Sequence, residues 1–138
     1  MKIFNTLSGK KEIFEPIEDN KIRMYVCGMT VYDDTHIGHA RTFLSFDLIV
    51  RYLRSIDYEV QYIRNITDVD DKIIARSEEL NISPSELTKD CINSMQNDFK
   101  ALGMISPDAE PRATENIDSI ISLITKLIDK GHAYVGES

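Results

Sequence analysis

The sequence of 138 residues has no extended apolar stretch, few cysteines and fewer basic than acidic residues. No segment approaches the ~20 consecutive apolar residues that a membrane-spanning helix needs. The amino terminus also lacks the apolar core of a signal peptide. These absences argue against a membrane protein and against export, so we expect a cytoplasmic protein with no membrane partner.

Basic side chains are outnumbered, because 16 Lys and Arg stand against 23 Asp and Glu, which gives a formal net charge of −7. Binding of nucleic acid by charge alone requires clustered Lys and Arg that neutralise phosphates. We therefore expect any grip on RNA to come mainly from residues outside this chain.

The two cysteines have different settings. In a chain of cytosolic character, two separate thiols are expected rather than one disulfide. Cys91 belongs to a helical stripe with Leu87, Met95 and Phe99, so burial as a small apolar residue explains it. Cys27 follows a predicted strand, where a side chain can face a cleft.

Hydrophobic patterning divides the chain into three parts and predicts an α/β fold. Residues 1–21 form a hairpin around a loop that contains Gly9. Residues 22–80 form a βαβ unit, with strands at 22–26 and 59–65, a helix from about Gly38 and a further helix at 69–80. Residues 81–138 are mainly helical, with one helix capped by Ser83 and ended by Gly103, and another capped by Thr114 and ended by Gly131.

The segment from Cys27 to Arg41 carries the clearest functional pattern. It joins a strand to a helix, where unpaired backbone N–H groups and the helix dipole attract phosphate. His36 and His39 lie three residues apart with Gly38 between them, so two imidazoles can flank an anion while the glycine lets a ligand approach the backbone. The pattern indicates a triphosphate site, and the alternative is two polar residues in an exposed loop.

The string His36-Ile37-Gly38-His39 resembles the HIGH signature of class I aminoacyl-tRNA synthetases. With Cys27 and residues 30–33 and 64–68, it is similar to the cysteinyl-tRNA synthetase family, and the similarity runs from residues 2–7 to residues 131–134. Members of that family are several times longer and carry a KMSKS loop that this sequence lacks. The resemblance implies a Rossmann-like class I catalytic fold, of which we expect residues 1–138 to be the incomplete amino-terminal part.

The resemblance also implies an enzyme that activates cysteine with ATP and magnesium, and then transfers the cysteinyl group to tRNA(Cys). His36 and His39 are the expected catalytic residues, because their N–H groups can stabilise charge in the transition state. We expect the chain to be inactive by itself. The expected ATP-binding residues are Thr30, Tyr32, His36, Gly38, His39 and Arg41.

Cys27, Gly28 and Thr67 are the expected amino-acid site, because parallel sheets bind ligands beyond the carboxyl ends of their strands. The resemblance implies that Cys27 is one zinc ligand and that the other ligands lie outside this chain. Zinc binds the substrate's thiolate far better than a hydroxyl, which rejects serine. In related enzymes the threonine that matches Thr67 contacts bound cysteine.

Several alternatives to these roles remain open. Cys27 can be an ordinary buried cysteine, or can form a local metal site with His36 and His39. Thr67 or the residue after it can cap the next helix. Tyr32 fits equally as a half-buried packing residue, and Arg41 as half of a surface salt bridge.

Two other functions also fit the pattern. A ligase can activate cysteine identically and transfer it to an amino-sugar acceptor in thiol biosynthesis. A synthetase-derived chain can instead serve as a non-catalytic interaction module. Acceptor assays separate the first from a tRNA ligase, and adenylate formation from ATP and cysteine separates the second.

Overall fold

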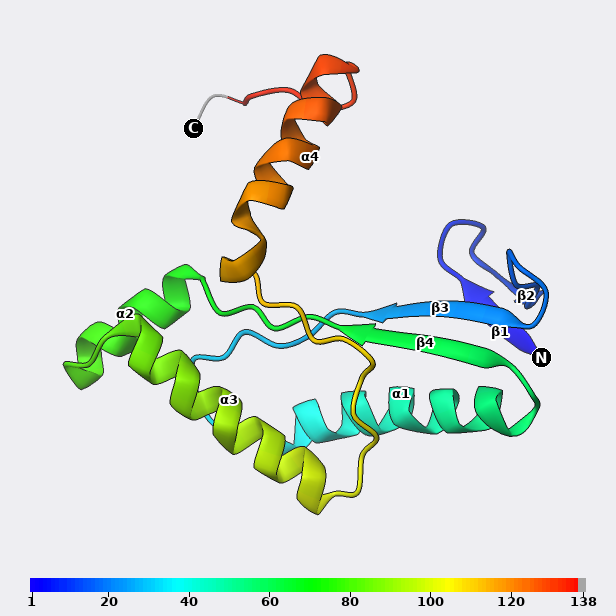
Figure 1. Cartoon of the computed structure of the whole chain (residues 1–138), viewed down its shortest axis with the longest axis horizontal. Coiled ribbons are helices and arrows are strands. Elements are labelled where there is room, and N and C mark those ends of the chain that lie inside the picture. Colours follow the sequence, from blue (N-terminus) through cyan, green and yellow to red (C-terminus); the bar gives the residue numbers. More distant parts are fainter. Residues whose placement is uncertain (137–138) are drawn as a thin grey trace.

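The computed structural model describes residues 1–136, which form two two-stranded sheets and four α-helices (Figure 1). Strands β1 (Lys2–Asn5) and β2 (Lys10–Ile13) pair as an antiparallel hairpin, as predicted. Every residue of both strands is exposed. The hairpin therefore lies at the edge of the molecule and contributes no strand residue to the core.

The central unit is the predicted βαβ arrangement. Strands β3 (Lys21–Val26) and β4 (Glu59–Arg64) pair in parallel, and helix α1 (Ile37–Ser55) connects them. One helix face is buried together with alternating strand residues, which matches the period of each element. The buried apolar residues of this unit are Ile22, Val26, Ala40, Phe43, Val50, Leu53, Val60 and Tyr62.

Helices α2 (Asp71–Leu80) and α3 (Pro84–Ala101) pack against each other beyond the carboxyl ends of the strands (Figure 1). The predicted cap of α3 is confirmed, because Ser83 Oγ accepts a hydrogen bond from Glu86 N at 3.1 Å. Helix α2 begins two residues later than predicted. Its cap is Asp70, whose Oδ1 accepts from Lys72 N at 2.9 Å, so capping by Thr67 or Asp68 is wrong.

Residues 108–113 form an extended segment along β4 that the sequence did not predict. Asp108 N donates to Tyr62 O at 2.7 Å, and Ile66 N donates to Pro111 O at 2.9 Å. Two prolines made this stretch look like a loop, since proline cannot donate to a ladder. At position 111, however, the sheet uses only the proline carbonyl.

A short 3₁₀ turn, η1 (Thr114–Asn116), leads into helix α4 (Ile117–Asp129). The prediction that Thr114 caps this helix is wrong, because its N and Oγ1 donate to the carboxylate of Asp68, at 2.9 and 2.5 Å. Helix α4 ends before Gly131, as predicted.

Every residue of α4 is exposed, and the helix stands away from the rest of the molecule (Figure 1). The division at residues 21 and 80 remains a prediction, and the last two residues of the third part lie outside the described range. Within residues 1–136, no helix has the length and apolar character needed to cross a membrane.

Candidate active site

The carboxyl ends of β3 and β4 and the amino end of α1 lie on the same side of the molecule (Figure 1). The loop after β3 runs beside the segment after β4, because Thr67 N donates to Met29 O at 3.1 Å and Val31 N donates to Thr67 O at 3.2 Å. Thr30 and Thr67 form a parallel bridge. Residues distant in sequence therefore meet where parallel sheets bind their ligands.

Two buried side chains hold the loop against the core. Met29 is 7% exposed and Val31 is fully buried, whereas Thr30 and Tyr32 between and after them are only partly buried. The Tyr32 ring packs against the core and has Lys72 Nζ 5.7 Å from its centre. Tyr32 therefore has the geometry of a half-buried packing residue, the alternative role that we considered for it.

The two histidines of the HIGH string stack on each other at the start of α1. Their ring centroids are 3.8 Å apart and their planes differ by 21°. His36 is the N-cap: its Nδ1 accepts from Gly38 N at 3.0 Å, while His39 Nδ1 accepts from His36 N at 3.4 Å. The two rings therefore accept hydrogen bonds from the backbone amides of His36 and Gly38. This corrects the expectation that the N–H groups at the start of this helix are all unpaired and free to bind phosphate.

This capping fixes the tautomer of both rings. A ring nitrogen that accepts a hydrogen bond carries no proton, so each neutral ring has its N–H at Nε2. Burial, and after it the charge of neighbouring His36, lowers the pKa of His39 below its ordinary value. At neutral pH, His39 is thus a neutral Nε2–H donor that needs no rearrangement to meet an anion.

Gly38 is required by the His36 ring. A Cβ atom at position 38 would lie 2.8 Å from Cε1 and 3.0 Å from Nδ1 of His36. The glycine was expected to admit a ligand to the backbone, and the structure supplies a second reason for it. Any side chain here would push the His36 ring out of its cap.

Cys27 has an exposed thiol, so the alternative of an ordinary buried cysteine is wrong for it. Its Sγ lies 3.7 Å from Gly28 O, a weak contact that leaves the sulfur available. Across residues 1–136, no three His, Cys, Asp or Glu side chains lie close enough to hold a metal. The local site of Cys27, His36 and His39 is therefore not formed.

The second cysteine behaves as its helical stripe predicted. Cys91 is a buried free thiol on α3. Burial is the main reason that its pKa is raised, and the nearby carboxylates of Asp34, Asp33 and Asp90 add to the effect. A raised pKa keeps the Cys91 thiol protonated and unreactive.

Gly28 packs directly on the backbone that follows β4. A Cβ atom at this position would lie 1.6 Å from the carbonyl oxygen of Asn65. Gly28 N also donates to Asn65 Oδ1 at 2.7 Å. Asn65 was not among the predicted site residues. Its only sequence signal was its place in the string at residues 64–68, since an asparagine after a strand otherwise indicates a turn.

Two further polar groups flank the histidines. Arg41 is exposed on the first turn of α1, and within residues 1–136 it makes no ion pair, so the surface salt bridge considered for it is not observed. Thr35 Oγ1 is buried and lacks a hydrogen-bond partner among the described residues. An unsatisfied buried hydroxyl next to His36 is a group that a bound ligand can satisfy.

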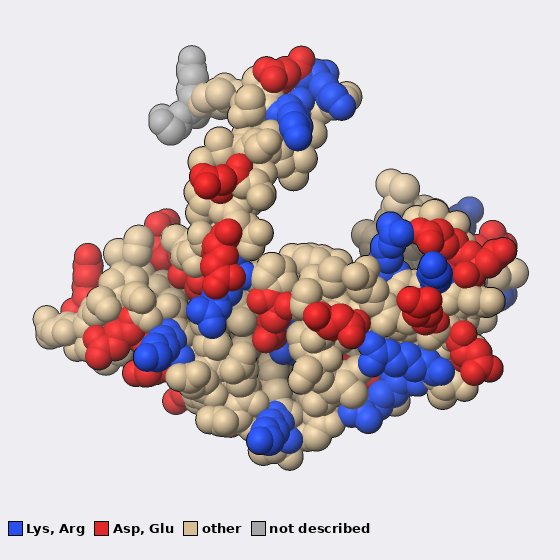
Figure 2. Space-filling view, in the orientation of Figure 1, with Lys and Arg blue, Asp and Glu red and all other residues tan. Residues whose placement is uncertain are grey.

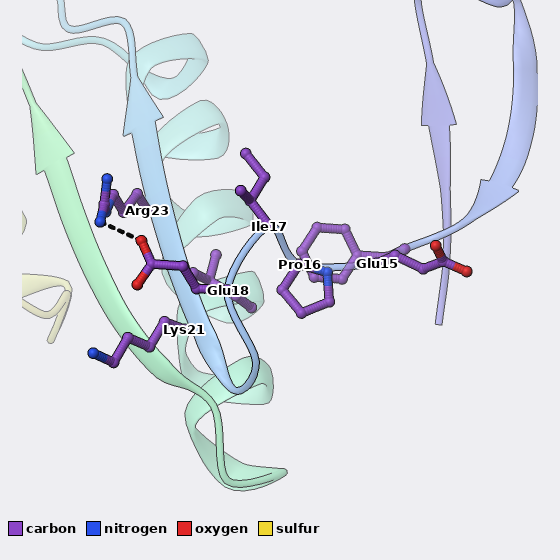
Figure 3. A pocket seen from close by; sticks show the side chains of 8 residues that line it. Glu15, Pro16, Ile17, Glu18, Lys21 and Arg23 are labelled. Carbon is purple, nitrogen blue, oxygen red and sulfur yellow. Dashed lines mark hydrogen bonds and ion pairs between the residues drawn. The ribbon is translucent and has the colours of Figure 1, made fainter.

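A separate cavity of about 300 Å³ lies between the hairpin and β3 (Figure 3). It is lined by residues 14–18 and 21–23, with the ion pair of Arg23 and Glu18 at its rim. Residues 21–23 belong to the amino-terminal half of β3 and residues 14–18 precede it, whereas parallel sheets bind nucleotides beyond the carboxyl ends of their strands. We therefore exclude this cavity as the nucleotide site.

Comparison with known proteins gives one matching family and a consistent set of relatives. The family model described as tRNA synthetases class I (C) catalytic domain matches residues 13–138. The chain is similar to the cysteine–tRNA ligase of Haemophilus influenzae (strain PittGG), with 56% identity over 138 residues, which is 100% of this chain and 30% of that protein.

Two further relatives carry the same name. The cysteine–tRNA ligase of Shewanella amazonensis is 58% identical over 135 residues, which is 98% of this chain and 29% of that protein. That of Marinomonas sp. (strain MWYL1) is 58% identical over 138 residues, which is 100% of this chain and 30% of that protein. The chain thus spans about 30% of the length of the curated relatives it matches.

Proposed function

Because the chain belongs to the family of class I (C) tRNA synthetase catalytic domains, we propose that the full-length protein is a cysteine–tRNA ligase. It activates cysteine with ATP and then transfers the cysteinyl group to tRNA(Cys). The expected α/β class I catalytic fold is confirmed by the family match. The relatives are named as tRNA ligases, so neither alternative function is favoured.

One observation carries the proposal. Two stacked imidazoles with Nε2–H donors cap the amino end of α1, beside the carboxyl ends of two parallel strands. This is where a class I fold binds ATP, and the chain is 56–58% identical to proteins named cysteine–tRNA ligase.

In the activation step, a carboxylate oxygen of cysteine bonds to the α-phosphorus of ATP, and the bond to pyrophosphate breaks. Negative charge spreads over the equatorial oxygens and the leaving group. His36 and His39 donate Nε2–H bonds to those oxygens, and the dipole of α1 adds positive potential at the same point. Magnesium bound with ATP would supply charge neutralisation at the phosphates. A hydroxyl of the terminal adenosine of tRNA(Cys) then attacks the carbonyl and releases AMP.

The other proposed ATP contacts surround the histidines. Thr30 lies in the loop after β3, and Arg41 supplies an exposed guanidinium on the first turn of α1. Tyr32 contributes a partly buried ring that packs on the core beneath the nucleotide. Gly38 keeps His36 in its cap, because a side chain at this position would meet the His36 ring.

Cys27, Gly28 and Thr67 form the proposed amino-acid site. The exposed thiol of Cys27 fits a zinc ligand, because among the described residues its sulfur makes only a weak contact with Gly28 O. When bound, zinc supplies a metal–sulfur bond to the substrate that serine cannot reproduce. The described residues offer one ligand, so the others belong to the part of the relatives' length that this chain does not span. Gly28 keeps Cys27 close to the strand end, and Thr67 contacts the amino acid.

The proposal is tested by cysteine-dependent exchange of pyrophosphate into ATP by the full-length protein. We expect His39→Ala to slow exchange by about a hundredfold, the loss typical of one transition-state donor. His132→Ala is the matched control, because His132 is exposed beyond the end of α4. An unchanged exchange rate in His39→Ala would refute the catalytic assignment.

Transfer is tested separately, by charging of tRNA(Cys) against charging of an amino-sugar acceptor. The face seen in Figure 2 mixes acidic and basic side chains instead of gathering the basic ones in one stripe. We therefore propose that tRNA is held mainly outside residues 1–136. We also propose that these residues alone do not charge tRNA. The full-length protein is proposed to work in the cytoplasm.

A further inference from the structure

The side chain of Asn65 joins three parts of the candidate site. Asn65 Oδ1 accepts from Tyr25 Oη at 2.8 Å and from Gly28 N at 2.7 Å. Its Nδ2 donates to Thr67 Oγ1 at 3.3 Å. One amide group therefore connects the end of β3, the peptide after Cys27 and the hydroxyl of Thr67.

The orientation of this amide is forced by the backbone. Gly28 N–H can only donate, so the atom that faces it must be the oxygen of Asn65. The nitrogen of Asn65 must then face Thr67, and Thr67 Oγ1 must accept. The backbone N–H of Gly28 therefore determines which atoms of Asn65 and Thr67 donate and which accept.

This pattern determines what Thr67 can offer a ligand. A threonine hydroxyl has one proton and two lone pairs, and here Asn65 occupies one lone pair. The backbone N–H and C=O of Thr67 are also occupied, by Met29 O and Val31 N. The hydroxyl proton is thus left to donate, and it suits an acceptor atom of a bound amino acid.

The same side chain fixes the position of the thiol. The peptide group between Cys27 and Gly28 is held by the bond from Gly28 N to Asn65 Oδ1. Gly28 also packs on the Asn65 carbonyl so closely that no Cβ fits between them. Movement of Asn65 would therefore displace Cys27 and Thr67 together.

We propose that Asn65 is a positioning residue for the amino-acid site: it makes the Thr67 hydroxyl a hydrogen-bond donor and holds the peptide between Cys27 and Gly28 in place. The inference rests on the proposed activation of cysteine. It adds that affinity for the amino acid, and not for ATP, depends on a residue that does not itself touch the reacting atoms.

The test is Asn65→Asp in the full-length protein, assayed by pyrophosphate exchange. The aspartate still accepts from Gly28 and Tyr25 but cannot donate to Thr67, so the Thr67 proton turns inward. We expect the KM for cysteine to rise about tenfold, the effect of one lost hydrogen bond. The KM for ATP should stay unchanged. Tyr25→Phe is the control, because it removes one donor and leaves the bonds to Gly28 and Thr67 in place.

A second variant keeps the inference testable if Asn65→Asp does not fold. Thr67→Val removes the hydroxyl that Asn65 orients, and it should raise the KM for cysteine by a similar factor. Where both single variants fold, the double variant should be no worse than Thr67→Val alone, since residues that act through one contact are not additive.

Three results would overturn the inference: an unchanged KM for cysteine in Asn65→Asp or in Thr67→Val, equal increases in the KM for ATP, or additive effects in the double variant. Failure of the proposed function is a different result. In that case the unsubstituted protein itself shows no cysteine-dependent exchange.

Discussion

Gly28 occupies the tightest backbone contact of the candidate site. Its Cα faces the carbonyl of Asn65 at a distance that excludes even a methyl group. The contact brings the segments after β3 and β4 together without any side chain between them. The shape of the site thus depends on the absence of a Cβ atom at position 28 as well as on the polar groups around it.

Replacement of this glycine tests that contact. Gly28→Ala should lower the free energy of unfolding by about 3 kcal/mol or more, because the added methyl must separate two paired segments. Gly136→Ala is the matched control, since no heavy atom of the described residues lies within 4 Å of the added carbon. Urea denaturation measures both, and equal stability of the two variants would contradict the contact.

The stacked histidines predict a pH dependence. The pKa of His39 is lower in the folded chain than its ordinary value of 6.5. As pH falls below 6.5, the unfolded chain therefore takes up a proton before the folded chain does, and stability decreases until both states are protonated. Protonation at Nδ1 also breaks the bond from His36 N.

NMR of the ring nitrogens measures this directly. We expect the Nε2–H tautomer for His36 and His39, and a titration midpoint for His39 below the ordinary histidine value of 6.5. A midpoint for His39 at or above 6.5 would show that the ring is not held as described.

Between secondary structure elements, the main polar connection is the pair of Arg64 on β4 and Glu110 on the extended segment. Arg64 Nε donates to Glu110 Oε1 at 2.9 Å, and the Arg64 side chain is only 6% exposed. Its guanidinium lies over two neighbouring rings, 4.9 Å from the centre of Phe43 and 4.8 Å from that of Phe99. One side chain therefore ties α1, α3 and the sheet together.

Loss of the carboxylate would leave a buried charge without a partner. We expect Glu110→Ala to reduce the free energy of unfolding by about 3 kcal/mol. Glu79→Ala is the control, because Glu79 pairs with Arg76 at the surface, and such pairs contribute less than about 1 kcal/mol. Thermal melting should rank the two variants in this order, and the reverse ranking would assign no stabilising role to the buried pair.

The helices and paired strands could be predicted because each follows from local pattern. Alternation, helical spacing and the cap at Ser83 were sufficient for β3, β4, α1 and α3. The ladder of residues 108–113 could not be predicted, since its partner is β4, more than 40 residues earlier. The cap expected at Thr114 failed for the same reason, because Asp68 accepts its hydrogen bonds.

The candidate site shows the same division. Cys27, His36 and His39 stood out because their residue types and spacing carry chemistry. Asn65 and the packing role of Gly28 could not be predicted in this way. They matter because they contact each other, and the sequence does not show that their two segments lie side by side. The tautomer of the two histidines likewise follows only from the observed cap.

Taken together, the described residues leave one element without a partner. Helix α4 has a stripe of isoleucines and leucines, and each of them is at least one-third exposed. Its surface in Figure 2 is largely uncharged along its length. An amphipathic helix gains most of its stability by packing that stripe, so α4 is the element least supported by the rest of the chain.

A polypeptide of residues 1–138 should therefore self-associate through α4 as its concentration rises. Replacement of Ile121 and Ile124 by aspartate should restore a monomer, because it places charge in the apolar stripe. Ile17→Asp is the control, since Ile17 is fully exposed in the segment before β3. Light scattering measures the mass, and association that persists in the double variant would assign it to another surface.

The parallel pairing of β3 with β4 has a consequence for how the molecule is made. Both strands and α1 lie within residues 21–64, so a ribosome delivers them before Asp108 and Glu110 exist. During that interval the Tyr62 amide and the Arg64 guanidinium lack the carboxylates that later accept their hydrogen bonds. The two strands can therefore pair early, but their hydrogen bonds to Asp108 and Glu110 form only after almost 50 further residues have been synthesised.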